Sequence, residues 1–216
     1  MDAYAQARAD LVEDLERGRH IRSTPVRRAF LAVPRERFVP EDLRSKAYLD
    51  TPLSIPMGQT ISAPSMIAIM LEEAELAEGQ TVLDVGTGSG YNAALLAVIV
   101  GAANVVSIER HADLAAFARD NLRAAGCADV RLVVGDGTLG HEPGAPYDRI
   151  VVTAGAPRIA RSWVRQTKVG GLIVAPIGRS TFSQVLVVAR KVAEERIETR
   201  EGTPCAFVPL VGREGW

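Results

Sequence analysis

Thr81-Val-Leu-Asp-Val-Gly-Thr-Gly-Ser-Gly90 is the stretch that decides the fold. Its apolar residues favour a β-strand, and its three glycines carry no Cβ that would keep a ligand away from the backbone. The apolar run that follows, from 92 to 100, predicts a helix buried beneath the glycine turn. A strand, a glycine turn and a helix together form the first half of a βαβ nucleotide site.

The spacing of the glycines narrows the choice of ligand. A dinucleotide loop requires G-x-G-x-x-G, whereas this loop is G-x-G-x-G, with Tyr91 where the third glycine would stand. The next predicted strand ends at Glu109, about 20 residues past the loop, where an acid accepts ribose hydroxyls. Each acid also has a purely structural interpretation when it is taken singly: Asp84 would cap the turn, and Glu109 would be a solvated residue at the end of a strand. Together with the loop they resemble the S-adenosylmethionine site of class I methyltransferases.

Length and composition limit the architecture and the partners. A chain of 216 residues with 47% hydrophobic content buries one substantial core, so we expect a single domain over 1–216. We divide it into N-terminal helices with a substrate-side loop (1–62) and a cofactor-binding sheet with the C-terminal strands (63–216). The net charge of −1 offers no field for a polyanion, so nucleic acid is not an expected partner.

Cysteine usage and apolar runs indicate the compartment. Cys127 and Cys205 are far apart and lack the C-x-x-C spacing of a zinc or redox site. The first twenty residues lack the basic start and apolar centre of a secretory signal, and no apolar run has transmembrane length. We therefore expect a cytoplasmic monomer that does not bind membranes. The three histidines are scattered and are expected to serve neither metal binding nor catalysis: His20, His111 and His141.

Hydrophobic periodicity predicts an α/β, Rossmann-like chain. The expected strands are Thr81–Val85, Val105–Glu109, Val130–Val134, Arg149–Thr153, Gly171–Ile177, Gln184–Arg190 and Cys205–Pro209. The expected helices are Ala3–Arg17, Thr24–Ala32, Pro64–Leu76, Asn92–Val100, Asp113–Ala125 and Arg158–Gln166. This alternation predicts a doubly wound, mainly parallel seven-stranded sheet with helices on both faces and an N-terminal helical addition. The charged run 191–202 favours an antiparallel, solvated hairpin. The irregular segment 41–62 is expected to form an ordered loop or a short hairpin.

The ends of the third and fourth predicted strands carry the remaining chemistry. Asp136 follows the third strand, and ligands of open α/β sheets lie at the carboxyl ends of strands, so Asp136 is expected to meet the adenine edge. The alternative is an Asp-Gly turn. Small residues at 154–156, after the fourth strand, leave room beside a sulfonium for a methyl acceptor. The Asn/Asp-Pro-Pro-Tyr type of motif that grips planar amines is missing there, which disfavours a base amine as acceptor.

Five motifs, in order along almost the whole chain, resemble the protein-L-isoaspartate (D-aspartate) O-methyltransferase family. They are VPRERFVP (33–40), GQTISAP (58–64), LDVGTGSGY (83–91), VGDGT (134–138) and FVPL (207–210). The resemblance implies transfer of a methyl group from S-adenosyl-L-methionine, which leaves S-adenosyl-L-homocysteine, to the free α-carboxyl of L-isoaspartyl or D-aspartyl residues. The partners it implies are damaged proteins and peptides, repaired through a succinimide.

The resemblance places the active-site serine at Ser62. An α-carboxyl with a pKa near 3.5 is already ionised at neutral pH, so Ser62 is expected to donate a hydrogen bond that orients it. Local sequence alone equally allows Ser62 to cap the helix that begins at Pro64. The residues expected to bind the cofactor are Thr60, Ile61, Asp84, Gly86, Thr87, Gly88, Ser89, Gly90, Asn92, Glu109, Arg110, Asp136 and Gly137. Those expected to bind the substrate are Gln59, Ser62, Val208, Pro209, Leu210 and Val211.

Several alternatives stay open at this point. The segment 207–210 is equally an edge strand or part of a peptide groove. The same site residues would serve a carboxyl methyltransferase that modifies a dedicated biosynthetic peptide. A further alternative is a methyltransferase-like binding module that has lost turnover. The presence of Asp84, Glu109, Asp136 and Ser62 argues against it. Neutral charge and the missing amine motif disfavour a nucleic-acid methyltransferase.

Overall fold

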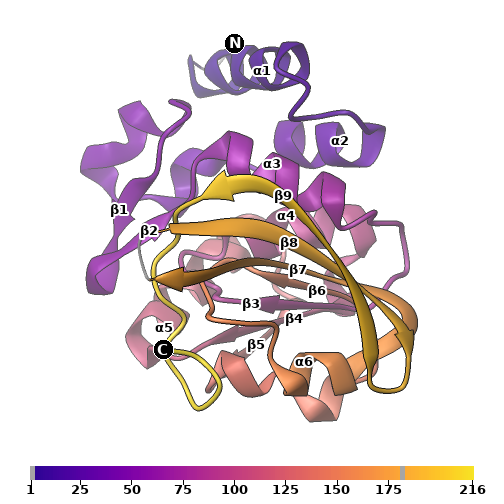
Figure 1. The fold of residues 1–216 in the computed structure, drawn as a ribbon. Helices are drawn as coiled ribbons and strands as arrows, with labels where there is room; N and C mark the ends of the chain where they lie inside the picture. Colours follow the sequence, from indigo (N-terminus) through magenta and orange to yellow (C-terminus); the bar gives the residue numbers. More distant parts are fainter. Residues whose placement is uncertain (1–2, 181–182) are drawn as a thin grey trace.

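The computed structural model describes residues 3–180 and 183–216. Within that part a sheet of seven strands runs through the molecule in the order β5-β4-β3-β6-β7-β8-β9 (Figure 1). Its strands are β3 (Val82–Val85), β4 (Val105–Glu109), β5 (Arg131–Val134), β6 (Tyr147–Val152), β7 (Thr167–Ser180), β8 (Ser183–Ala193) and β9 (Arg196–Cys205). Neighbours are parallel from β5 through β7 and antiparallel from β7 through β9. The predicted, mainly parallel sheet is confirmed.

Alternating side chains of the central strands divide the core between the two faces of the sheet. Val82 and Val151 pack on the side of the N-terminal helices, whereas Leu83 and Ile150 pack on the other face with Trp163. Strands covered on both faces need apolar side chains at every position, which explains their unbroken hydrophobic runs.

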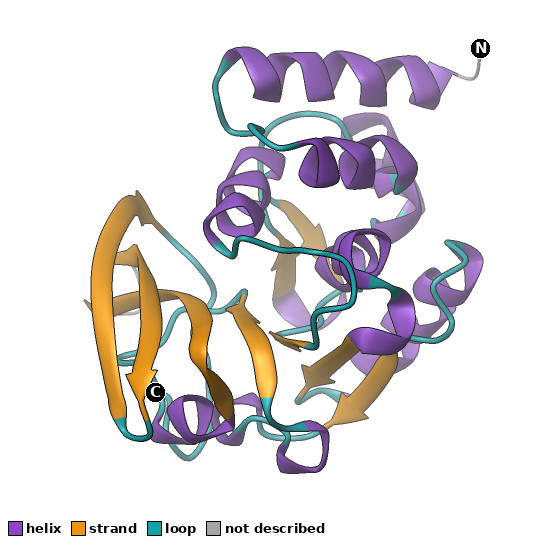
Figure 2. Ribbon diagram, turned by 90° about the vertical axis from the view of Figure 1, so that its right-hand side faces the viewer, coloured by secondary structure: helices purple, strands orange, loops and turns teal. Residues whose placement is uncertain are grey.

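The helices cover both faces of the sheet (Figure 2). They are α1 (Ala3–Arg17), α2 (Thr24–Ala32), α3 (Pro64–Glu73), α4 (Tyr91–Val100), α5 (Ala112–Ala124) and α6 (Arg161–Gln166). In Figure 1, α1 and α2 form an outer layer above α3 and α4, while α6 lies below the sheet. Leu11, Phe30 and Leu96 belong to one continuous core cluster, so the outer layer packs directly on the sheet helices. No helix among the described residues combines the length and the apolarity that crossing a membrane requires.

All six predicted helices are present, and the largest differences in their boundaries are at one end of α3 and of α6. Helix α3 ends at Glu73 and not at Leu76, and α6 begins at Arg161 and not at Arg158. The irregular segment 41–62 contains a short antiparallel hairpin of β1 (Leu53–Ile55) and β2 (Gln59–Ile61). Of the two forms expected for this segment, an ordered loop or a short hairpin, the structure has the hairpin.

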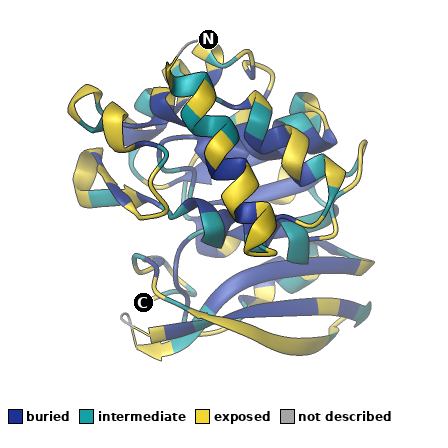
Figure 3. Cartoon of the chain, turned by 90° about the horizontal axis from the view of Figure 1, so that it is seen from above, coloured by how far each residue is buried: buried dark blue, intermediate teal, exposed yellow. Residues whose placement is uncertain are grey.

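The last predicted strand, Cys205–Pro209, is wrong. The final strand is β9, which begins inside the charged run and ends at Cys205, while Pro209 makes only an isolated bridge with Gly155. Strand β9 lies at the edge of the sheet and is largely exposed (Figure 3). An edge strand pairs on one side only and keeps contact with water, so charged residues are favoured there. The predicted antiparallel hairpin is therefore present, formed by β8 and β9, but its second strand is longer and earlier.

Candidate functional site

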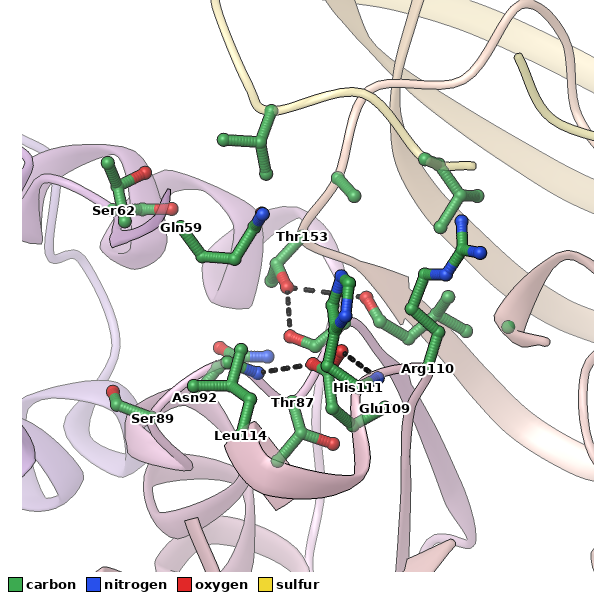
Figure 4. Close-up of a pocket in the computed structure, with 18 of the residues that line it drawn as sticks. Gln59, Ser62, Thr87, Ser89, Asn92, Glu109, Arg110, His111, Leu114 and Thr153 are labelled. Atoms are coloured by element: carbon green, nitrogen blue, oxygen red, sulfur yellow. Dashed lines mark hydrogen bonds between the residues drawn. The ribbon is translucent and has the colours of Figure 1, made fainter. Parts of the chain in front are cut away.

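A cavity of about 230 Å³ opens at the carboxyl ends of β3, β4 and β6. Its walls come from the glycine loop after β3, the hairpin strand β2, the end of β4 and the C-terminal segment 208–211. Figure 4 shows Ser62 and Gln59 on one side of the cavity, well apart from Glu109 and Arg110 on the other. The cavity therefore lies where an open α/β sheet binds its ligand.

The glycine loop needs its glycines for backbone conformation. The φ angles of Gly86, Gly88 and Gly90 are +95°, +56° and +92°, a region that L side chains rarely adopt. Gly86 and Gly88 line the cavity, but Gly90 does not. A Cβ on Gly90 would lie 3.3 Å from the carbonyl oxygen of Ala118, so Gly90 allows α4 and α5 to approach closely.

Asp84 lies beneath the loop and does not line the cavity. It is fully buried, and its carboxylate accepts hydrogen bonds from Asn92 Nδ2 at 2.8 Å and Ser107 Oγ at 2.7 Å. Burial raises the pKa of Asp84 to about 6, against the opposing effect of these two hydrogen bonds. Asp84 thus ties the start of α4 to strand β4 and supports the loop from below.

Asn92 lines the cavity and carries a buried, unsatisfied acceptor. Its Nδ2 is used by Asp84, and its buried Oδ1 has no hydrogen-bond partner among the described residues. Asn92 lines the cavity beside the glycine loop. A buried acceptor without a partner costs free energy unless a ligand donates to it.

Glu109 places a carboxylate at the carboxyl end of β4, inside the cavity. Its relative exposure is 6%, and it accepts hydrogen bonds from the backbone N–H of Gly88 at 3.0 Å and of His111 at 3.1 Å. Each carboxylate oxygen keeps further lone pairs, so Glu109 is able to accept hydrogen bonds from ribose hydroxyls at the same time. Glu109 is therefore a buried acid beside the glycine loop and not a solvated strand end.

Both carboxylate oxygens of Asp136 accept hydrogen bonds from other residues of the protein. Its Oδ1 accepts from the backbone and hydroxyl of Thr138, and its Oδ2 accepts from the backbone of Arg213 at 2.8 Å. Although burial opposes the change, these hydrogen bonds lower the pKa of Asp136. Asp136 does not line the cavity, whereas the adjacent Gly137 does. Arg110 also lines it and donates to the carbonyl of Val211. Asp136 thus joins the C-terminal segment to the turn that carries Gly137.

Ser62 lies between this cavity and a smaller one of about 160 Å³. The residues that line both cavities are Thr60, Ser62, Thr153 and Val208. The alternative role of Ser62 as a helix cap is wrong, because the N-cap position of α3 belongs to Ala63 and carries no side-chain cap. The Ser62 hydroxyl has no partner among the described residues, so it is available to a ligand at the junction of the two cavities.

The structure brings together most of the predicted site residues. All of them line the larger cavity except Asp84, Gly90 and Asp136. Ala154, one of the small residues expected beside the acceptor, also lines the cavity. Sequence reasoning missed several lining residues, namely Gly58, Ile67, Val85, Tyr91, Ile108, His111, Leu114 and Thr153. Thr153 donates a hydrogen bond to the carbonyl of Gly86 at 2.7 Å. Its position directly after β6, and that of His111 just after β4, are the signals that would have found them.

Comparisons with known proteins agree with this geometry. The profile of the protein-L-isoaspartate (D-aspartate) O-methyltransferase family matches residues 6–215. A protein-L-isoaspartate O-methyltransferase of Hyperthermus butylicus is 52% identical, over 99% of this chain and 92% of its own. A structure named protein-L-isoaspartate O-methyltransferase has a TM-score of 0.85 at 31% identity, over 96% of this chain and 67% of its own. A Plasmodium falciparum structure described as the same kind of enzyme, in complex with S-adenosyl-L-homocysteine, has a TM-score of 0.83 at 28% identity, covering 94% and 97%.

Proposed function

The chain belongs to the protein-L-isoaspartate (D-aspartate) O-methyltransferase family, and we propose that it methylates the free α-carboxyl of L-isoaspartyl residues, and of D-aspartyl residues, in damaged proteins and peptides. The methyl donor is S-adenosyl-L-methionine, and the ester that forms leads to repair through a succinimide. The observation that carries this proposal is Ser62, whose free hydroxyl stands where the larger, cofactor-side cavity meets the smaller one.

The larger cavity has the groups that the cofactor needs. S-adenosyl-L-methionine supplies an electrophilic methyl group on a positively charged sulfur. Glu109 would hold the ribose, Asn92 would form part of the wall beside the glycine loop, and the loop would let the backbone approach the ligand. We assign Asp84 and Asp136 to the same binding site through the segments that they fix, the glycine loop and the turn at Gly137.

Ser62 acts on the acceptor without removing a proton. The α-carboxylate is ionised at neutral pH, so no general base is required. The Ser62 hydroxyl donates a hydrogen bond to one carboxylate oxygen and directs the other toward the methyl group. Val208, which lines both cavities, keeps water from the junction. Holding the reacting atoms in line there supplies much of the rate. Gln59, Pro209 and Val211 complete the proposed peptide-binding wall.

A matched pair of peptides tests the proposed reaction. One contains an isoaspartyl residue and the other an aspartyl residue in the same sequence, and both are incubated with labelled S-adenosyl-L-methionine. We expect label only in the isoaspartyl peptide. Equal labelling of both, or labelling of neither, would remove the proposal.

Replacement of Ser62 tests its role. Ser62→Ala should lower kcat on the isoaspartyl peptide by about tenfold to 100-fold, the cost of losing a hydrogen bond to a charged group, while S-adenosyl-L-homocysteine binds as before. Ser65→Ala is the matched control, because Ser65 lies on the adjacent turn of α3 and lines neither cavity. An unchanged kcat in Ser62→Ala would contradict the assignment.

We propose that the whole chain works as one catalytic domain and as a monomer. The core shared by α1, α2 and the sheet helices supports one domain, and one chain supplies the walls of both cavities. The net charge of −1 supports a substrate other than nucleic acid. Cys127 and Cys205 are both unpaired, which supports a reducing, cytoplasmic location.

A further inference from the structure

Arg35 is a buried charge whose presence the reaction above does not explain. It begins a 3₁₀ turn, Arg35–Phe38, and its relative exposure is 0%. It lines neither cavity. Among the described residues, no carboxylate forms an ion pair with it: the neighbouring Glu36 is taken by Tyr48 and Arg8. A guanidinium buried in this way needs other compensation.

The contacts of Arg35 reach two separate walls of the larger cavity. Its Nη2 donates to the carbonyl of Ser62 at 2.9 Å, and its Nε donates to the carbonyl of Ala47 at 2.8 Å. Its Cζ lies 5.0 Å from the ring centre of Tyr91, the first residue of α4 after the glycine loop. Ser62 and Tyr91 both line the larger cavity. Arg35 therefore connects Ser62 to α4, the helix that follows the glycine loop.

A contribution to the stability of the fold does not by itself explain why an arginine is buried here. Nη1 of Arg35 is buried and has no hydrogen-bond partner among the described residues. Burial also lowers the pKa of Arg35, and the opposing effects of Tyr91, Tyr48 and Asp50 do not offset it fully. Buried charges are often replaced by apolar residues with no loss of stability, or with a gain. An apolar residue cannot reproduce the fixed fork of donors, which holds the carbonyls of Ser62 and Ala47 while the guanidinium lies over the Tyr91 ring.

We propose that Arg35 is a positioning residue for methyl transfer, which holds Ser62 at a fixed distance from the start of α4 and so from the glycine loop. This inference rests on the proposed function, because it assumes that Ser62 orients the acceptor. In-line transfer tolerates little displacement of the carboxylate from the methyl group: a shift of about 1 Å costs about 100-fold in rate. Arg35 limits that displacement from outside the cavity.

Arg149 provides a matched control. Its guanidinium also donates to backbone carbonyls, those of Ala74, Glu75 and Asp148, and it is partly buried. It lines neither cavity and holds the C-terminal end of α3, not the end that follows Ser62. Loss of its fork should therefore lower stability without displacing Ser62.

The experiment compares Arg35→Lys with Arg149→Lys on the isoaspartyl peptide. Lysine keeps the charge but cannot form the fork. We expect kcat of Arg35→Lys to fall by about tenfold to 100-fold, with S-adenosyl-L-homocysteine affinity close to that of the unaltered chain. Arg149→Lys should lower Tm and leave kcat unchanged. A wild-type kcat in Arg35→Lys, or equal losses of kcat in both variants, would overturn the inference.

A double-variant cycle with Tyr91→Leu separates positioning from simple packing. If Arg35 and Tyr91 act as one unit, the double variant loses less kcat than the product of the two single losses. Losses that multiply would contradict the inference. An Arg35→Lys chain that fails to fold would also overturn it, because the residue would then serve folding. Inactivity of the unaltered chain on both peptides of the matched pair removes the proposed function itself, and is thus a distinct outcome.

Discussion

Replacing Glu109 by glutamine removes a carboxylate charge from the cavity while keeping the shape of the side chain. In the structure both carboxylate oxygens are acceptors, one for the backbone N–H of Gly88 and one for that of His111. A glutamine amide has a single oxygen, so its NH₂ group would face one of these N–H donors or turn toward the ligand. Either way the variant loses an acceptor that the ribose hydroxyls would use.

The expected loss of affinity follows from the number and kind of hydrogen bonds. A hydrogen bond to a charged group contributes about 1.5–3 kcal/mol, and about 1.4 kcal/mol changes a dissociation constant tenfold. Since Glu109 is only 6% exposed, water does little to replace the lost acceptor. Glu109→Gln should therefore weaken binding of S-adenosyl-L-homocysteine by about tenfold to 100-fold.

Calorimetric titration with two ligands makes this prediction specific. S-adenosyl-L-homocysteine and its 2′-deoxy analogue are each titrated into the unaltered chain and into Glu109→Gln. If Glu109 accepts from the ribose, removal of the hydroxyl weakens binding to the unaltered chain much more than binding to the variant. The exposed Glu142, which does not line the cavity, gives the control variant Glu142→Gln. Equal Kd values for the unaltered chain and Glu109→Gln, or a deoxy effect of the same size in both, would refute the reasoning.

Two further predictions concern the support of the loop. Burial raises the pKa of Asp84 from 3.8 to about 6, so the folded chain holds this proton more tightly than the unfolded chain. Its contribution to the free energy of unfolding should fall by about 2 kcal/mol as pH rises from 4 to 6. Urea titrations at several pH values should show this fall in the unaltered chain and not in Asp84→Asn. Gly137→Ala would place a Cβ 2.7 Å from Val85 Cγ1. Gly137→Ala should lower the free energy of unfolding by about 1–3 kcal/mol and weaken S-adenosyl-L-homocysteine binding. Thermal unfolding with and without the ligand measures both effects. The control Gly202→Ala, whose Cβ would meet only a 3.4 Å contact, should change neither quantity.

The cofactor half of the site was predictable because its information is local. The glycine loop directly follows β3, and Glu109 ends β4, so the rule that ligands meet the carboxyl ends of strands is enough to place them. The same rule places Thr153 after β6 and His111 after β4. A systematic reading of every strand end would therefore have predicted these two as well.

Asp84 and Asp136 were harder to interpret, because their partners are distant in the sequence. Asp84 pairs in register with Ser107 of β4, and Asp136 accepts from Arg213, near the end of the chain. Nothing in either motif reveals that the carboxylate is already bonded within the protein. The position of β9 was missed for a related reason. Edge strands are shaped by solvent on one side, so hydrophobic periodicity is weak there.

The acceptor half depends on segments that meet only in the folded chain. Ser62 lies after the β1–β2 hairpin, Arg35 comes from a turn between the outer helices and that hairpin, and Val208 comes from the C-terminal segment. None of these segments has a periodicity of its own, and none contributes to the sheet that positions the glycine loop. In the proposed function the local glycine loop serves the methyl donor, whereas the acceptor is held by residues brought together only through long-range contacts such as that between Arg35 and Ser62.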